Sequence, residues 1–447
     1  MTQQKRPAHR PTAAPRAEPG GRGGGAGRLP EQSLAKLLEM ASTRSEAVAQ
    51  PAATRPAPLR RTSRVITAPA PPIDAPALAR IAGSPNPAAS RLEFVTNPFR
   101  ALAALRPQSL GVSYWFTAPD GPASFRVDVR FTGHRLDVTG ARTPADDFVA
   151  TADAVDVAPG GGPIALTHRV AGVAPGRWSV TAQAYATPDG ADRAAVIRLP
   201  TAEGVGESVY APVAGSRAPG VVVGAWPTMV GLGFLLGLLV QGLLARVHGL
   251  STGPVLLLAL VAGILGVLGA KAYYRVTHVR EVATSWLAGL SVQGFVIVAT
   301  GVFVVGGRLE GMDIGHLLDA TIPALLVGQA VGRLGCLLAG CCSGRPTTRH
   351  WAIWSSDRTI GTRRLPVQVL ESSSAGALAL VTGLIAWRTP PEHAGFLFLA
   401  GLAAYVLVRQ ILFPLRGLPR ATRYGRAVML VVAPAVIAGS IAGLVLG

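Results

Sequence analysis

The sequence predicts an all-α polytopic membrane protein of about seven helices, preceded by a disordered N-terminal tail and a small β-sandwich domain. Two windows without Asp, Glu, Lys or Arg, residues 218–245 and 282–307, are each long enough to cross roughly 30 Å of hydrocarbon as a helix. Residues 88–212 alternate apolar and polar side chains with period two, as half-buried strands do. Residues 1–87 are rich in Pro, Ala, Gly and Arg and cannot bury enough surface to fold.

The tail and the charge balance bear on possible partners. Lys and Arg number 25 against 17 Asp and Glu over residues 1–217, and 17 against 7 over residues 218–447. Almost no aromatic residues lie among the basic ones in the tail, so we expect no nucleic-acid partner. The first 40 residues contain no apolar h-region, so we expect the first membrane helix to act as the targeting signal.

Residues 88–212 contain the predicted strands. In SFRVDVRF, Phe125, Val127 and Val129 share one face, while Arg126 and Asp128 share the other. The stretch GRWSVTAQAY repeats this alternation, and PDG turn signals separate the strands. These features favour an antiparallel β-sandwich of immunoglobulin or fibronectin type. Nothing in it indicates catalysis, so we expect a binding or spacer module.

The predicted membrane domain spans residues 217–447. Its seven hydrophobic segments are 219–245, 250–271, 284–306, 317–341, 366–387, 394–415 and 427–446. Arg333, Glu371 and Arg409 stand within or at the edge of three of these segments. Charge inside a membrane usually marks a functional site, although an Arg–Glu pair that locks two helices together is the alternative.

Further arginines lie in two loops on the same side of the membrane. They are Arg345, Arg349, Arg358, Arg363 and Arg364 in one loop, and Arg416, Arg420, Arg423 and Arg426 in the other. A guanidinium group binds phosphate with two parallel hydrogen bonds and stays charged at any relevant pH. The residues alone therefore predict a phosphate-binding site, suited to a phospholipid headgroup, at one membrane face.

The stretch DATIPALLVGQAVGRLGCLLAGCCSGRPT, residues 319–347, resembles the signature of prolipoprotein diacylglyceryl transferases, in which G-R-[IL]-G-N-F-x-N-G-E-x-x-G-R follows an Asp and a Pro. Three more stretches resemble motifs of this family in the family's order: WPTMVGLGF, RRLPVQVLES and AYVLVRQILFPLR. The resemblance covers about residues 220–447. It implies a multi-pass protein of the bacterial plasma membrane.

The family transfers the diacylglyceryl group of phosphatidylglycerol to the thiol of a lipobox cysteine in a preprolipoprotein. The resemblance implies this transferase activity, with phosphatidylglycerol, the preprolipoprotein signal peptide and membrane lipid as partners and with no cofactor or metal. It implies that Arg333 and Arg409 hold the lipid phosphate and that Tyr405 assists them in catalysis. It also implies a substrate-binding set of Arg345, Arg364, Gln368, Glu371, Gly332, Gly335, Gly344 and Gln293.

Several positions depart from the family pattern. Gln293 stands where the family has a His proposed as general base, and Gln cannot usefully accept a proton. Cys336 and Cys341 replace an Asn and a Glu, and Phe413 replaces a second Glu. The alternative function is therefore that of a catalytically silent paralogue that binds anionic phospholipid or lipoprotein precursors.

The three cysteines of the chain, Cys336, Cys341 and Cys342, lie together in this signature. We expect small packing residues there, while an arginine-activated thiolate with nucleophilic or redox chemistry is a second interpretation. A metal site is a third, although the spacing matches no standard zinc pattern.

The charged membrane positions all lie after Arg217, so we expect the sandwich to be dispensable for chemistry. By resemblance to the family, the arginine-rich loops and the sandwich would lie outside the cytoplasm. The positive-inside rule argues for the opposite orientation, but arginines that bind lipid phosphate need not follow it.

Overall fold

The computed structural model describes residues 90–97, 102, 104–190, 196–277, 289–388, 394–417 and 424–446. All of them belong to one compact unit, Pro58–Gly447. The tail predicted over residues 1–87 lies outside the described residues, as do Arg420 and Arg423 of the second arginine-rich loop.

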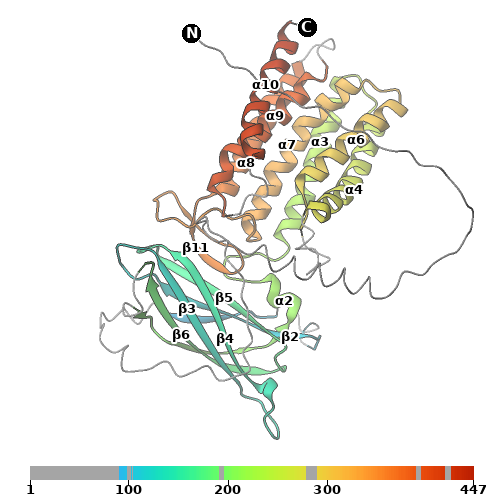
Figure 1. Ribbon diagram of the computed structural model, residues 1–447. Helices are drawn as coiled ribbons and strands as arrows, with labels where there is room; N and C mark the ends of the chain where they lie inside the picture. The colour runs from blue at the N-terminus through green and yellow to red at the C-terminus, as the bar shows by residue number, and fades with distance from the viewer. Residues whose placement is uncertain are drawn as a thin grey trace, which may run out of the picture. The chain divides into compact units, whose positions relative to one another are not determined.

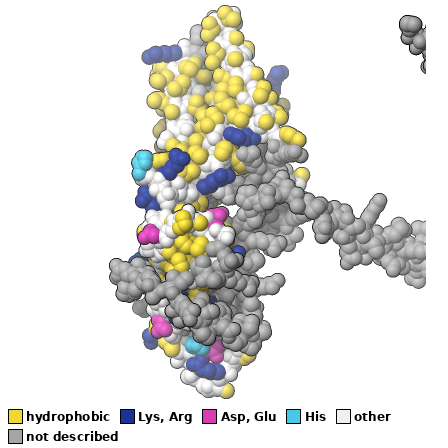
Figure 2. Space-filling view, turned by 60° about the vertical axis from the view of Figure 1, so that its left-hand side comes forward, with side chains coloured by type: hydrophobic (Ala, Val, Ile, Leu, Met, Phe, Trp, Pro, Cys, Tyr) yellow, Lys and Arg dark blue, Asp and Glu magenta, His cyan; other side chains and the backbone are white. Residues whose placement is uncertain are grey.

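The described residues contain seven helices long and apolar enough to cross a membrane, which confirms the prediction of a polytopic protein. They are α3 (Ala225–Val247), α4 (Thr252–Thr277), α6 (Val292–Leu309), α7 (Ile314–Leu338), α8 (Val367–Arg388), α9 (Phe396–Leu412, continued by the 3-10 turn η7, Phe413–Leu415) and α10 (Gly425–Leu446). On the face that Figure 2 draws, hydrophobic side chains cover most of the bundle, as a lipid environment requires.

The region before the bundle and two strands from the loop between α7 and α8 form two antiparallel sheets (Figure 1). The first has the order β1 (Arg91–Phe94), β2 (Gln108–Thr117), β5 (Pro163–Ala171), β11 (Ile360–Arg364) and β10 (Ile353–Ser356), with β9 (Val209–Tyr210) also paired to β2. The second has the order β4 (Asp147–Val157), β3 (Phe125–Arg135), β6 (Arg177–Pro188) and β7 (Ile197–Arg198), with β8 (Ala202–Glu207) also paired to β6. A short helix, α2 (Ala211–Ser216), follows β9.

The two sheets share one hydrophobic core, which makes this region a sandwich. Phe125, Val127 and Val129 of β3 are buried in it, whereas Arg126 and Asp128 are exposed, as the period-two pattern predicts. Side chains from both sheets fill this core, so each sheet buries the apolar face that it could not leave in water.

The strands β10 and β11 were not predicted, because they come from the loop between α7 and α8. Ile360 and Gly361 pair with Leu166 and Ala165 of β5, and Ile360 joins the sandwich core. The Trp354 ring stacks on that of Trp115 with the centroids 5.5 Å apart. A loop of the membrane domain therefore completes a sheet of the sandwich.

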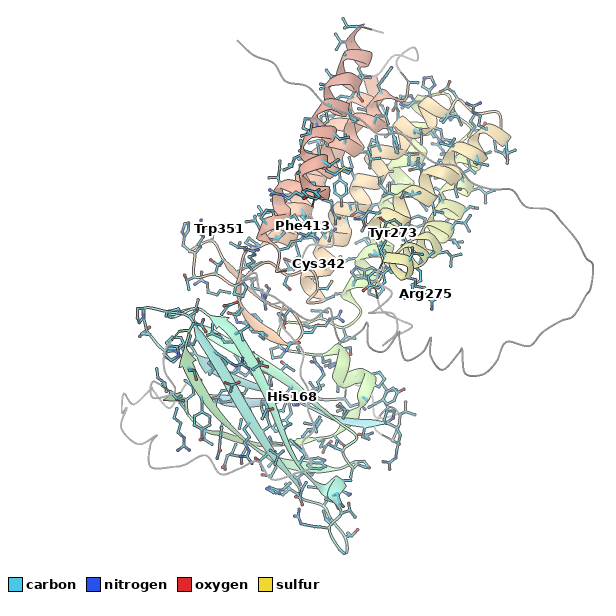
Figure 3. All side chains as sticks on the ribbon, in the orientation of Figure 1. His168, Tyr273, Arg275, Cys342, Trp351 and Phe413 are labelled. Carbon is cyan, nitrogen blue, oxygen red and sulfur yellow. The ribbon has the colours of Figure 1, made fainter. Side chains whose placement is uncertain are left out.

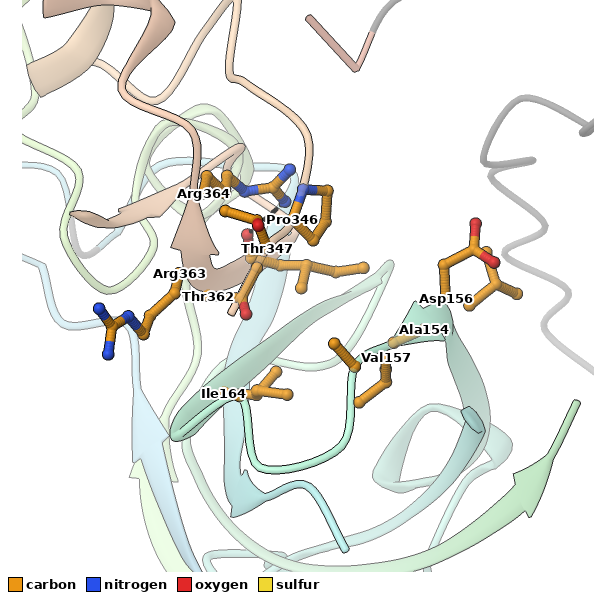
Figure 4. A pocket seen from close by; sticks show the side chains of 13 residues that line it. Ala154, Asp156, Val157, Ile164, Pro346, Thr347, Thr362, Arg363 and Arg364 are labelled. Carbon is orange, nitrogen blue, oxygen red and sulfur yellow. Dashed lines mark hydrogen bonds between the residues drawn. The ribbon is translucent and has the colours of Figure 1, made fainter. Parts of the chain in front are cut away.

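A small cavity of about 30 Å³ lies beside this hairpin. Figure 4 shows Thr362 and Arg364 of β11 on one side of it and Val157 and Ile164 of the sandwich on the other. It has room for little more than a water molecule.

The helix α7 lies inside the bundle, against α3 and α8 (Figure 1). Small residues make the contact with α3 close: a Cβ on Gly335 would lie 2.8 Å from Met229 Cβ. The buried carboxylate of Asp319 accepts hydrogen bonds from the backbone N–H groups of Gly395 and Phe398 at 2.7 and 2.8 Å. It thereby caps the first turn of α9 from a neighbouring helix and fixes α9 against α7.

Candidate active site

A cavity of about 370 Å³ lies inside the bundle, between α3, α4, α6 and α7. Apolar side chains form most of its wall, in keeping with a site for acyl chains or another apolar group. The polar side chains in the wall include Gln241, Thr321, Gln329 and Arg333, together with the three cysteines. No His, Asp or Glu belongs to the wall as far as the described residues form it.

Arg333 of α7 brings positive charge to this cavity. Its side chain is nearly inaccessible, and Nε lies 3.3 Å from Glu371 Oε2 on α8. The other oxygen of the same carboxylate accepts a hydrogen bond from Arg416 Nη2, just after η7. The Nε atom of Arg416 is buried without a hydrogen-bond partner.

The cluster of Arg333, Glu371 and Arg416 is not neutral. Two guanidinium groups at +1 and one carboxylate at −1 leave a net charge of +1 in a buried place. A simple helix-locking pair would need one arginine only. Because buried charge is costly unless it is paired, this cluster favours an anionic ligand.

Arg409 and Tyr405 of α9 reach the cavity through a third residue. Arg409 Nη1 donates to the Tyr405 hydroxyl at 3.2 Å, and that hydroxyl donates to Gln329 Oε1 at 2.8 Å. Gln329 lines the cavity, but Tyr405 and Arg409 do not. No carboxylate pairs with Arg409 over the part of the chain that the structure describes, so its charge is available to a ligand.

The three cysteines come together at the C-terminal end of α7, where Figure 3 labels Cys342. Gly340 has φ +64°, the Cys341 N–H donates to the Cys336 carbonyl at 3.0 Å, and the Gly340 N–H donates to the Leu337 carbonyl at 3.3 Å. This is a Schellman motif, whose geometry brings the side chains at the positions of Cys336 and Cys341 together. Cys342, itself at φ +54°, adds a third thiol. The three sulfur atoms lie within 4.8 Å of one another.

The electrostatic surroundings of Cys342 favour its ionised form. Hydrogen bonds with the Cys336 and Cys341 thiols lower the pKa of the Cys342 thiol, and the positive charges of Arg333 and Arg416 lower it further. A thiolate is the form that attacks electrophiles and binds metals. Cys342 is therefore a chemically competent group in the cavity wall.

Other residues of the predicted substrate-binding set hold the loops around the cavity in place. Gln368 donates to the Cys341 carbonyl at 3.1 Å, and Arg345 Nε donates to the Arg416 carbonyl at 3.2 Å. Gly344 is packed too closely for a side chain, since a Cβ there would lie 2.1 Å from the Leu365 carbonyl oxygen. These contacts position the turn that carries the cysteines and Arg416.

Arg364, Gly332 and Gly335 lie in three different surroundings. Arg364 donates to Asp357 Oδ2 at 2.8 Å and to the Gly344 carbonyl at 3.2 Å, so its charge is used within the hairpin. Gly332 lines the cavity, whereas Gly335 lies in the contact between α3 and α7.

Gln293 is the one predicted site residue that the structure leaves away from the others. Its side chain is exposed, and its Oε1 accepts a hydrogen bond from Ser291 at 2.8 Å. The cavity wall includes its neighbours Val292 and Phe295 but not Gln293. Gln293 lies in the first turn of α6, and a match to one motif position does not determine which way the side chain at that position points.

Several cavity residues were not predicted. Gln329 precedes Arg333 by one helical turn, a spacing that places both on one face of α7. Gln241 donates to the Thr321 hydroxyl at 2.8 Å across α3 and α7. Buried glutamines in otherwise apolar spans were a usable signal for both. Arg416 was predicted as one of the loop arginines, but its contact with Glu371 depends on tertiary structure alone.

The fold and this site define a multi-pass membrane protein with a largely apolar cavity that is lined by one arginine and three thiols. Residues 212–445 match the family model described as prolipoprotein diacylglyceryl transferase. The chain belongs to this family of membrane transferases.

Individual relatives give the extent of the similarity. The chain is 26% identical over 214 residues to the phosphatidylglycerol–prolipoprotein diacylglyceryl transferase of Clostridium tetani. The aligned region covers 45% of this chain and 84% of that protein. Proteins with the same name from Dehalococcoides mccartyi and Geobacillus kaustophilus are 34% identical over 125 residues and 29% identical over 130 residues. The chain spans about half the length of these last two, 47% and 48%.

Proposed function

We propose that the chain transfers the diacylglyceryl group of phosphatidylglycerol to the thiol of a lipobox cysteine in a preprolipoprotein. The observation that carries this proposal is the cluster in which Arg333 and Arg416 share the carboxylate of Glu371 beside a largely apolar cavity. Such a site offers an unbalanced positive charge to a phosphate and an apolar space to acyl chains. The names of the relatives point to the same substrates.

In this proposal, Arg333 and Arg409 hold the phosphate of the lipid. Tyr405 orients Arg409 through the hydrogen bond between them, and Glu371 and Gln368 hold Arg333 and the cysteine turn in place. The acceptor sulfur attacks the glycerol carbon that carries the phosphate oxygen, the C–O bond breaks, and glycerol phosphate leaves with the electron pair. Fixed guanidinium groups stabilise the negative charge that develops on this leaving group.

The proposed location is the bacterial plasma membrane, with the sandwich outside the cytoplasm. We divide the chain into a tail over residues 1–87, an immunoglobulin- or fibronectin-like sandwich over residues 88–212, and a membrane domain over residues 217–447. The sandwich would then lie where translocated preprolipoproteins emerge, as an interaction module beside the transfer site.

One observation favours the alternative of a silent paralogue. Gln293 stands where the family has a His, and no His, Asp or Glu among the described residues lines the cavity. A chain without a base could still bind anionic phospholipid or lipoprotein precursors through the arginines. Growth of a transferase-depleted bacterium distinguishes the two functions.

The experiment expresses the chain in such a bacterium and follows both growth and the diacylglyceryl modification of a lipoprotein. We expect the wild type to restore both. Arg333→Ala should fail, because it removes a charge-assisted contact worth roughly 1.5–3 kcal/mol, or tenfold to a hundredfold in affinity. Ser343→Ala, in the same loop but outside the charge cluster, is the matched control. An inserted wild type that binds phosphatidylglycerol but restores neither would support the silent paralogue.

A further inference from the structure

The three cysteines have no role in the reaction proposed above, yet their arrangement is that of a ligand set. Their sulfur atoms lie within 4.8 Å of one another, on the wall of the cavity. Zinc bonds to thiolate sulfur at about 2.3 Å, which in a tetrahedral centre separates the sulfurs by about 3.8 Å. Small side-chain rotations would therefore bring all three sulfurs to one ion.

The backbone that carries the cysteines is held in place from several sides. The Schellman motif fixes Cys336 and Cys341, and Gln368 holds the Cys341 carbonyl. Arg358 Nε donates to the Ala339 carbonyl at 2.8 Å. Cys342 occupies the left-handed region, which is strained for a residue with a side chain and tends to be kept where function requires it. A preformed turn lowers the entropy lost on metal binding.

The charge of a zinc-bound cysteine cluster would be opposite to that of the neighbouring arginine cluster. One zinc ion at +2 with three thiolates at −3 gives −1, and the cluster of Arg333, Arg416 and Glu371 carries +1. The sum is zero, so the zinc–thiolate centre and the arginine cluster balance each other, and Arg409, which pairs with no carboxylate among the described residues, keeps its positive charge for the phosphate. Thiolate ligands also select zinc over harder cations such as magnesium.

We propose that Cys336, Cys341 and Cys342 bind one zinc ion whose fourth position is open to the cavity and binds the acceptor thiol. Three protein ligands and one open position are typical of catalytic zinc sites. A thiol that coordinates zinc gives up its proton, so the metal does the work of a general base. This role rests on the proposed transfer function, and it explains how the described cavity wall can lack a His, Asp or Glu that would act as a general base.

In the proposed step, zinc activates the acceptor thiol as a nucleophile. The acceptor thiol binds zinc and releases its proton to water. The zinc-bound sulfur then attacks the glycerol carbon of phosphatidylglycerol, a C–S bond forms, and the C–O bond breaks with its electron pair passing to the phosphate oxygen. Zinc keeps its oxidation state. The thioether product is a weaker ligand than a thiolate, which allows it to leave.

The first experiment measures metal in the full chain, purified in detergent after zinc loading and removal of excess metal. We expect one zinc per chain in the wild type and in Ser343→Ala, and loss of zinc in the triple variant C336S/C341S/C342S. Cobalt in place of zinc should give thiolate-to-metal charge-transfer absorption, and X-ray absorption should give three sulfur ligands at about 2.3 Å. A wild type that transfers diacylglyceryl groups without bound metal would overturn the proposal while the transfer function stands.

The second experiment separates the role of the metal from that of the arginines. Cys342→Ser should lower kcat by about a hundredfold or more, the range expected for loss of thiol activation, with unchanged affinity for phosphatidylglycerol vesicles. Chelation of the wild type should give the same loss, and added zinc should reverse it. Stoichiometric zinc in a chain that never transfers would uphold the metal site and reject the transfer function. Full turnover in Cys342→Ser would reject the catalytic role of zinc.

Discussion

Glu371 sets the charge of the site at the residue scale, because its single carboxylate contacts both Arg333 and Arg416. Removing one partner of a buried charge cluster leaves the others uncompensated, at a cost of about 3–5 kcal/mol. An anionic lipid would supply the missing negative charge. Glu371 therefore affects both the stability of the lipid-free protein and the affinity of the site for a lipid phosphate.

This coupling gives a prediction for Glu371→Gln. The variant should unfold at a lower temperature than the wild type, and phosphatidylglycerol should raise its unfolding temperature by more than it raises that of the wild type. Diacylglycerol, which has no phosphate, should not stabilise the variant more than the wild type. Ser372→Ala, on the same helix and uncharged, is the matched control. Equal stabilisation of Glu371→Gln and the wild type by phosphatidylglycerol would show that the cluster does not contact the phosphate.

Part of the site could be predicted from single residues. Arg333, Glu371 and Arg409 were recognisable because charge is rare inside apolar spans, and Arg333 and Glu371 are in contact. The sharing of Glu371 with Arg416 could not be predicted, because Arg416 follows a helix end and reaches the carboxylate only through the fold. The cysteine cluster had a local signal, Gly340 between Cys336 and the last two cysteines, that spacing rules for zinc do not include.

At the element scale, the hairpin of β10 and β11 connects the soluble and membrane parts of the chain. Arg169 of β5 donates to the Arg358 carbonyl at 2.8 Å, and Arg358 in turn holds the Ala339 carbonyl beside the cysteines. Trp354 Nε1 donates to the Pro163 carbonyl at 2.9 Å. These contacts give a reason to expect that the sandwich positions the cysteine turn, although sequence alone suggested that the sandwich is dispensable.

Two truncated chains test this role. A chain that begins at residue 88 keeps the described contacts of the sandwich and should retain full transfer activity. A chain that begins at residue 212 loses β5 and exposes Ile360 and Trp354, so it should insert but transfer at least about tenfold more slowly, because small displacements of catalytic groups are costly. The assay is transfer by purified protein, with circular dichroism to confirm helix content. Equal transfer rates for the two chains would show that the sandwich does not position the groups needed for transfer.

The elements differ in how far their sequences determine them. The membrane helices were predictable because each has a long apolar run, and β3 because its alternation is regular over the whole strand. The strands β10 and β11 have only 4 and 5 residues, and β11 pairs with a strand far earlier in the chain. Such short strands acquire their conformation from the sheet they join, so no local pattern indicates them.

At the scale of the whole molecule, the pairing of β11 with β5 places the sandwich at the same end of the bundle as the loop after α7. The order of the helices leads to the same placement. The chain enters the bundle at the start of α3, and after α3, α4, α6 and α7 it returns to the same end, where the loop after α7 begins. The orientation of this end remains a prediction, and we expect it to be outside the cytoplasm. Protease added to intact spheroplasts should then cleave the sandwich, whereas protection of residues 88–210 would reverse the topology.

The most direct measurement of the central claim uses the purified full chain in vesicles of phosphatidylglycerol with a synthetic lipobox peptide. Mass spectrometry then detects a diacylglyceryl thioether on the peptide cysteine. We expect product from the wild type and roughly tenfold to a hundredfold less from a folded Arg333→Ala variant, since a charge-assisted contact to phosphate is lost. Equal product formation by the wild type and Arg333→Ala would contradict the assignment of the transfer site to this cavity.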